Sequence, residues 1–78
     1  MKYLVNPPQV GDTYRVEHNN EMLYDAQIME HDGGCWATVK VEKILPSSKE
    51  KMYKEGQVFD LKLSHYSLYD LEESDIKE

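Results

Sequence analysis

The chain has 78 residues, with 15 acidic and 9 basic side chains and a formal net charge of −6. A chain of this length buries only about 60% of the surface that it exposes when unfolded, so it has room for one thin hydrophobic core. Its 40% hydrophobic and 31% charged residues are typical of a folded, soluble domain rather than a disordered one. The sequence contains no apolar run that could span a bilayer, and Cys35 alone cannot form an internal disulfide, so we expect a cytoplasmic protein without membrane contact.

The acidic charge is concentrated at the end of the chain. Five acids face only Lys77 in the last nine residues, which leaves the body nearly balanced. Nucleic-acid binding depends largely on neutralising phosphates, so this distribution makes a nucleic-acid ligand a weak candidate without excluding it. We expect an extended lead-in over 1–9, a single domain over 10–71 and a flexible acidic tail over 72–78.

The first predicted elements are an extended lead-in and a strand. Pro7 and Pro8 favour extended backbone and interrupt any signal-peptide core. Gly11-Asp12 predicts a turn, and the alternation over 13–17 predicts a half-buried strand with Tyr14 and Val16 on one face. The polar residues 18–21 predict a connecting loop.

Two alternating runs between Leu23 and Val41, separated by Asp32-Gly33-Gly34, predict a β-hairpin. With Asp32-Gly33 as the two loop residues, Ile28 lies opposite Ala37, Ala26 opposite Val39, Tyr24 opposite Val41 and Asp25 opposite Lys40. A loop centred on Gly33-Gly34 keeps the same faces but sets Asp25 against Glu42. Like charges directly opposite one another are unfavourable, so we expect the first register.

The remaining elements are shorter. Pro46 ends the second hairpin strand, and Ser47 or Ser48 can cap a short helical turn near 48–55 that Gly56 closes. The residues from Val58 to Ser64 alternate as a strand. After His65 the pattern permits either a bulged continuation or a short final strand.

Four or five short strands with one helical turn predict an all-β fold, a small single-domain and partly open β-barrel. Four segments carry a resemblance: Val10-Gly11-Asp12, Tyr24 to Ile28, the Asp32-Gly33-Gly34 turn, and Trp36 to Val41. Over residues 10–45 the chain resembles SH3-like barrels of the Tudor or KOW type. Tudor modules cluster several aromatic residues into a ligand cage, whereas the aromatic residues of this chain are spread along the sequence, so no such cage is expected.

Cys35 and His31 flank the hairpin turn, and a thiol near an imidazole is the minimum for an activated nucleophile. No orienting group or donor-lined pocket accompanies them. With Asp32 and either His18 or His65 they include the residue types that bind zinc, but one cysteine and scattered ligands are a weak signal. We therefore expect no catalytic residue, no metal, no cofactor and no enzymatic activity.

The outer face of the hairpin is the leading candidate surface, because Leu23, Met29 and Trp36 project from it in the expected register. An exposed tryptophan beside a methionine favours a contact site. The alternative is that Tyr3, Leu4 and Val5 fold over Trp36 and bury it. For Tyr66 and Tyr69, core or rim packing and ligand stacking both remain open.

The function that these features favour is a non-catalytic binding module that holds a protein or peptide through the hairpin face. The binding residues proposed from the sequence are Trp36, Met29, Leu23, Tyr66 and Tyr69. The first alternative is a small acidic regulator or inhibitor, of the kind that phages encode, which mimics nucleic acid with its carboxylates. The second is a nucleic-acid-binding small barrel that stacks bases on its aromatic residues. Oligomeric state and the identity of the partner do not follow from the sequence.

Overall fold

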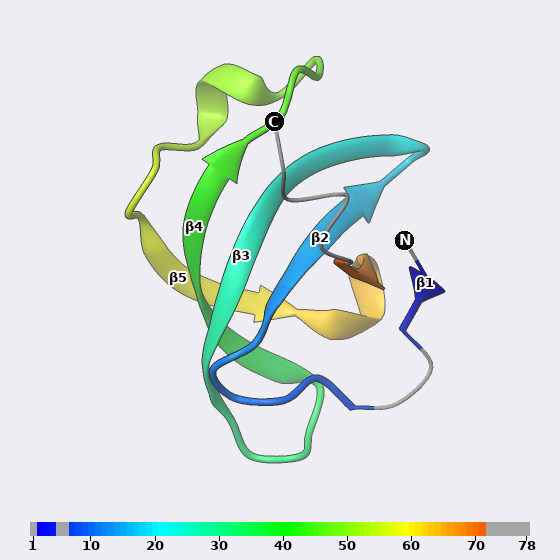
Figure 1. The fold of residues 1–78 in the computed structure, drawn as a ribbon, viewed down its shortest axis with the longest axis vertical. Coiled ribbons are helices and arrows are strands. Elements are labelled where there is room, and N and C mark those ends of the chain that lie inside the picture. The colour runs from blue at the N-terminus through cyan, green and yellow to red at the C-terminus, as the bar shows by residue number, and fades with distance from the viewer. Residues whose placement is uncertain (1, 5–6, 72–78) are drawn as a thin grey trace.

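The computed structural model describes residues 2–4 and 7–71. Its strands form a single antiparallel sheet in the order β1-β6-β2-β3-β4-β5 (Figure 1). They are β1 (Lys2–Tyr3), β2 (Thr13–His18), β3 (Glu21–His31), β4 (Trp36–Ile44), β5 (Val58–Lys62) and β6 (Ser67–Asp70). The prediction of an all-β fold is confirmed.

The sheet curves around one core, to which every long strand contributes buried residues. After β5, the chain passes through a 3₁₀ turn, η2 (Leu63–His65), and returns as β6 to pair with β2. The two outermost strands, β1 and β5, are not paired with each other, so the sheet remains open. The helical turn expected near 48–55 is a single 3₁₀ turn, η1 (Glu50–Met52).

The first hairpin connects β2 to β3 through Asn19 and Asn20. Both residues have positive φ, 52° and 66°, as a two-residue type I′ turn requires. Asparagine tolerates this left-handed conformation better than most residues, which explains the pair of asparagines at the turn.

The register predicted for the second hairpin is wrong. Ile28 lies opposite Val39 and Ala26 opposite Val41, which is the register of a loop centred on Gly33-Gly34. Asp25 does not meet Glu42, because the pairing shifts between Asp25 and Ala26, so that Asp25 lies opposite Lys43. Glu42 is the extra residue of this bulge. A one-residue bulge thus removes the like-charge pair that had argued against this register.

Leu23 is also misplaced by the prediction, since its side chain is 0% exposed and lies in the core. The β2–β3 pairing shifts so that Val16 lies opposite Tyr24 and Glu17 opposite Met22, which makes Leu23 the extra residue. A bulge interrupts the strict alternation of a strand, and here both Leu23 and Tyr24 are buried. Leu23 therefore cannot belong to an outer binding face.

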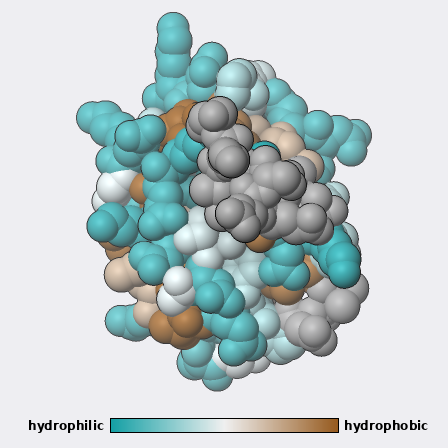
Figure 2. Space-filling view, viewed as in Figure 1, coloured by the Kyte–Doolittle hydropathy of each residue, from teal (hydrophilic) through white to brown (hydrophobic). Residues whose placement is uncertain are grey.

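The two ends of the chain differ in what the structure describes. Lys2 and Tyr3, in the expected lead-in, form β1 by pairing with Asp70 and Tyr69 of β6. The predicted tail over 72–78 lies outside the described residues. Within the described ranges, no helix is long and apolar enough to cross a membrane. In the orientation of Figure 1 the surface is largely hydrophilic, with hydrophobic residues in small separate groups (Figure 2).

Candidate functional site

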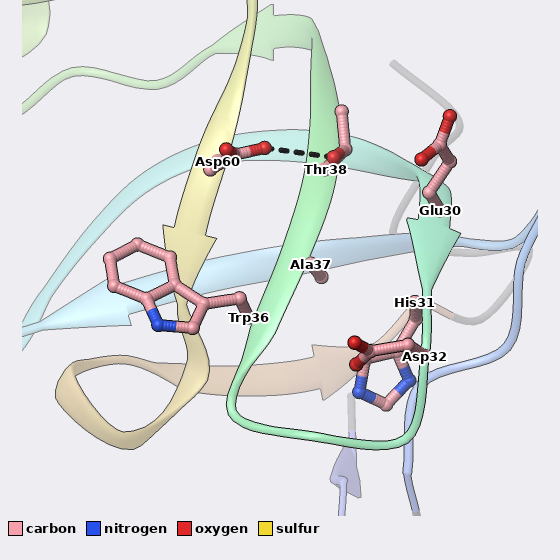
Figure 3. Close-up of a pocket in the computed structure, with 7 residues that line it drawn as sticks. All are labelled: Glu30, His31, Asp32, Trp36, Ala37, Thr38 and Asp60. Carbon is pink, nitrogen blue, oxygen red and sulfur yellow. Dashed lines mark hydrogen bonds between the residues drawn. The ribbon is translucent and has the colours of Figure 1, made fainter.

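The candidate site is an open groove of about 350 Å³ on the outer face of β3, β4 and β5 (Figure 3). β4 forms its floor at Ala37 and Thr38. The Trp36 indole stands on one side, over β5, and the residues around the β3–β4 loop stand on the other. The lining residues are Glu30, His31, Asp32, Trp36, Ala37, Thr38 and Asp60.

Trp36 is the main apolar element of this groove, and 54% of its surface is exposed. It lies opposite Lys62 in the β4–β5 pairing, and the Lys62 Nζ atom sits 5.9 Å from the centroid of the indole. The N-terminal residues that the structure describes do not cover Trp36. Tyr3 packs edge-to-face on Tyr69, with ring centroids 5.6 Å apart, and Leu4 packs against the core. Of the two outcomes left open by the sequence, the structure shows an exposed Trp36.

Three carboxylates give the groove negative charge: Glu30 from β3, Asp32 from the hairpin loop and Asp60 from β5. Two of them are held in place by short hydrogen bonds. The Thr38 hydroxyl donates to Asp60 Oδ1 at 2.8 Å, and the Gly34 N–H donates to Asp32 Oδ1 at 2.9 Å. An exposed aromatic ring beside fixed carboxylates can bind a cationic side chain by charge attraction and by cation–π contact.

The structure does not bring all five residues proposed from the sequence together. Met29 is 42% exposed at another bulge, where β3 shifts between Ile28 and Glu30. Tyr66 lines a different hollow, where its ring lies 5.1 Å from that of His18. Tyr69 packs with Tyr3. Neither tyrosine lines the Trp36 groove, and Tyr66 lines two other hollows that Trp36 does not reach.

Cys35 and His31 each contact other groups, and no hydrogen bond joins them in the described part of the chain. The His31 Nε2 atom lies 3.0 Å from the Gly34 carbonyl oxygen, to which it can donate a hydrogen bond. Cys35 is exposed, and hydrogen bonds from Ser64 lower the pKa of its thiol. No group of three or more potential metal ligands occurs among residues 2–4 and 7–71.

A cluster of aromatic residues is the feature that sequence reasoning missed. The ring of Tyr24 lies 4.7 Å from Tyr53 and 6.0 Å from Phe59, and Tyr53 and Phe59 stack at 6.0 Å. Tyr24 is fully buried, and its hydroxyl has no hydrogen-bond partner in the described part of the chain. Burial raises the pKa of Tyr24 and, to a smaller extent, that of Tyr53. The cluster is therefore part of the core.

We expect Tyr24→Phe to stabilise the domain by about 1–3 kcal/mol, because it removes a buried hydroxyl without a partner and keeps the ring. In the wild type the unfolded chain loses the Tyr24 proton near pH 10.0, whereas the folded chain still holds it. The free energy of unfolding should accordingly fall as the pH rises above 10, and less steeply in the variant. Urea unfolding at pH 7 and pH 10.5 measures both effects. Tyr53→Phe is the control, and an equal gain there would contradict this explanation.

Comparisons with protein-family models, curated proteins and solved structures gave no significant match.

Proposed function

We propose that this chain is a non-catalytic binding module that holds a short segment of a partner protein in the Trp36 groove. The observation that carries this proposal is the exposure of Trp36 on a sheet face where the neighbouring side chains are polar. Large aromatic residues contribute strongly to binding because they bury much surface at low conformational cost. The groove is open and shallow, which suits a peptide better than an enclosed small molecule.

The charge of the groove indicates the chemistry of the partner. Glu30, Asp32 and Asp60 line it, and the Lys62 ammonium lies beside it over Trp36. A lysine or arginine of the partner would contact these carboxylates and the indole face together. Phosphates would meet three like charges there, so a nucleic-acid ligand is disfavoured at this site.

We further propose that the curved sheet is a partly open small barrel of the SH3-like kind, in a reducing compartment. The return of β6 to β2, which bends the sheet around its core, supports the barrel. The Cys35 thiol is free and exposed, which supports a reducing compartment, because such a thiol would be oxidised more readily elsewhere.

We expect Trp36→Ala to abolish peptide binding and to leave the domain folded, since the side chain is more than half exposed. Trp36 is the single tryptophan of the chain, so its fluorescence reports directly on the groove. A set of short synthetic peptides, alternating valine with lysine or arginine, serves as the probe. Binding should shift the emission of the wild type to the blue, and calorimetry measures the loss in the variant.

Three controls make this test decisive. Peptides with glutamate in place of the basic residues should not bind, and Cys35→Ser should bind like the wild type. Circular dichroism establishes that Trp36→Ala is folded. Undiminished binding by a folded Trp36→Ala variant, or equal binding of the acidic peptides, would overturn the proposed groove.

A further inference from the structure

Among residues 2–4 and 7–71, β5 forms one edge of the sheet and pairs with β4 alone (Figure 1). The Val41 N–H donates to the Gln57 carbonyl at 2.9 Å, and the Leu63 N–H donates to the Cys35 carbonyl at 2.7 Å. Main-chain groups alternate in direction along an antiparallel strand. The N–H and C=O groups of residues 57, 59, 61 and 63 therefore face β4, and those of Val58, Asp60 and Lys62 face the open edge.

This edge differs from the opposite one in what it offers another strand. β1 has only two residues, whereas β5 has five and contains no proline. Its inward side chains, Phe59 and Leu61, are apolar and belong to or pack against the core. Edge strands of this kind can accept another strand unless their side chains prevent it.

The edge side chains have a self-complementary pattern. Asp60 and Lys62 carry opposite charges two residues apart on the same face. When two antiparallel copies of β5 meet at a two-fold axis through Leu61, Asp60 of each copy lies opposite Lys62 of the other. An axis through Asp60 instead would set the two Asp60 carboxylates against each other. Charge therefore selects the first register.

The neighbouring strand already orients both charged groups. Lys62 lies over the Trp36 indole, and the Thr38 hydroxyl binds Oδ1 of Asp60 (Figure 3). The Oδ2 atom of Asp60 can then accept from Lys62 of a second copy. On one face of the joined sheet, the side chains of Trp36 and Lys62 from one copy are then followed by those of Asp60 and Thr38 from the second copy.

We propose that two copies of this chain associate through their β5 edges, antiparallel, to form one continuous sheet with two Asp60–Lys62 pairs. The contact joins the edges of the two sheets and uses the Asp60 carboxylate that also lines the Trp36 groove. It requires no peptide in that groove, so the dimer can be tested separately from the proposed function. Each Asp60–Lys62 pair also exchanges two main-chain hydrogen bonds. An interface this small gives a weak dimer that forms as the concentration rises.

Sedimentation equilibrium of the full chain over a wide concentration range tests the proposal. The weight-average mass should rise from 9.2 kDa towards twice that value. Lys62→Asp and Asp60→Lys should each hold the mass at the monomer value, because both place like charges opposite each other. An equimolar mixture of the two variants should dimerise, since every facing pair then has opposite signs. The double variant Asp60→Lys/Lys62→Asp should dimerise alone.

Lys40→Asp is the matched control, because it makes the same charge change on an exposed residue of β4 away from the edge. It should dimerise like the wild type, and circular dichroism should show every variant folded. A wild type that stays monomeric at all concentrations overturns the proposal. So does dimerisation of Lys62→Asp alone, or a monomeric mixture of the two folded charge variants.

Discussion

Replacement of Arg15 by methionine is expected to lower the free energy of unfolding by about 3 kcal/mol. Arg15 Nε donates to Asp25 Oδ1 at 2.6 Å, and its Nη2 donates to Asp25 Oδ2 at 3.0 Å. Asp25 is only 4% exposed, so loss of the guanidinium leaves a buried carboxylate without its bidentate partner. Lys43, opposite Asp25 on β4, remains beside it and keeps the cost at the lower end of the usual range. Urea unfolding measures the change.

A double variant distinguishes the free-energy cost of an unpaired buried carboxylate from the net contribution of the Arg15–Asp25 pair to stability. Arg15→Met/Asp25→Leu removes both charges and should restore stability to within about 1 kcal/mol of the wild type, because the desolvation cost disappears along with the attraction. A loss below about 1 kcal/mol in Arg15→Met alone would show that the pair behaves like an exposed salt bridge.

The Arg15–Asp25 pair also shows why the sequence did not predict all contacts of the sheet. Alternation predicted β2, β4, most of β3 and all of β5, although the strand predicted to Ser64 ends at Lys62. It also placed Tyr14, Ala26, Ile28 and Val39 on the buried face, as the structure confirms. The partner expected for Asp25, Lys40, was wrong, and Lys40 lies opposite Gln27. A residue in a central strand has neighbours on both sides, and the pattern of one hairpin predicts only one of them.

The register error of the second hairpin begins at its loop, where His31 pairs with Ala37 rather than with Gly34. Three bulges add further shifts elsewhere in the sheet. Leu23, Met29 and Glu42 are each an extra residue where the pairing shifts. A bulge changes the local alternation by one residue, and nothing in the composition of these segments marks it. Its position depends on tertiary packing and charge, as at Glu42, whose carboxylate accepts a hydrogen bond from the Thr13 hydroxyl at 2.8 Å.

The candidate site was predictable in part. Trp36 stands out from the hairpin pattern alone. Glu30 was not predicted as a site residue, and Asp32 was predicted only as a turn residue or a candidate zinc ligand. Asp60 reaches the same groove from β5, after a connection of more than ten residues with little regular structure. The cluster of Tyr24, Tyr53 and Phe59 depends on the same connection. Contacts across such a segment depend on how the chain folds back in three dimensions, which local sequence patterns do not encode.

Leu23 and Met29 offer the most direct comparison between the expected and the observed faces of the hairpin. Leu23→Ala is expected to destabilise the domain by about 2–5 kcal/mol, because the side chain is fully buried and its removal leaves a cavity. Met29→Ala should change stability by less than about 0.5 kcal/mol, because that side chain is 42% exposed. Parallel urea unfolding of the two variants measures the difference. If both residues lay on one outer face, the two losses of unfolding free energy would be small and similar. Equal losses would therefore contradict the bulge that places Leu23 in the core.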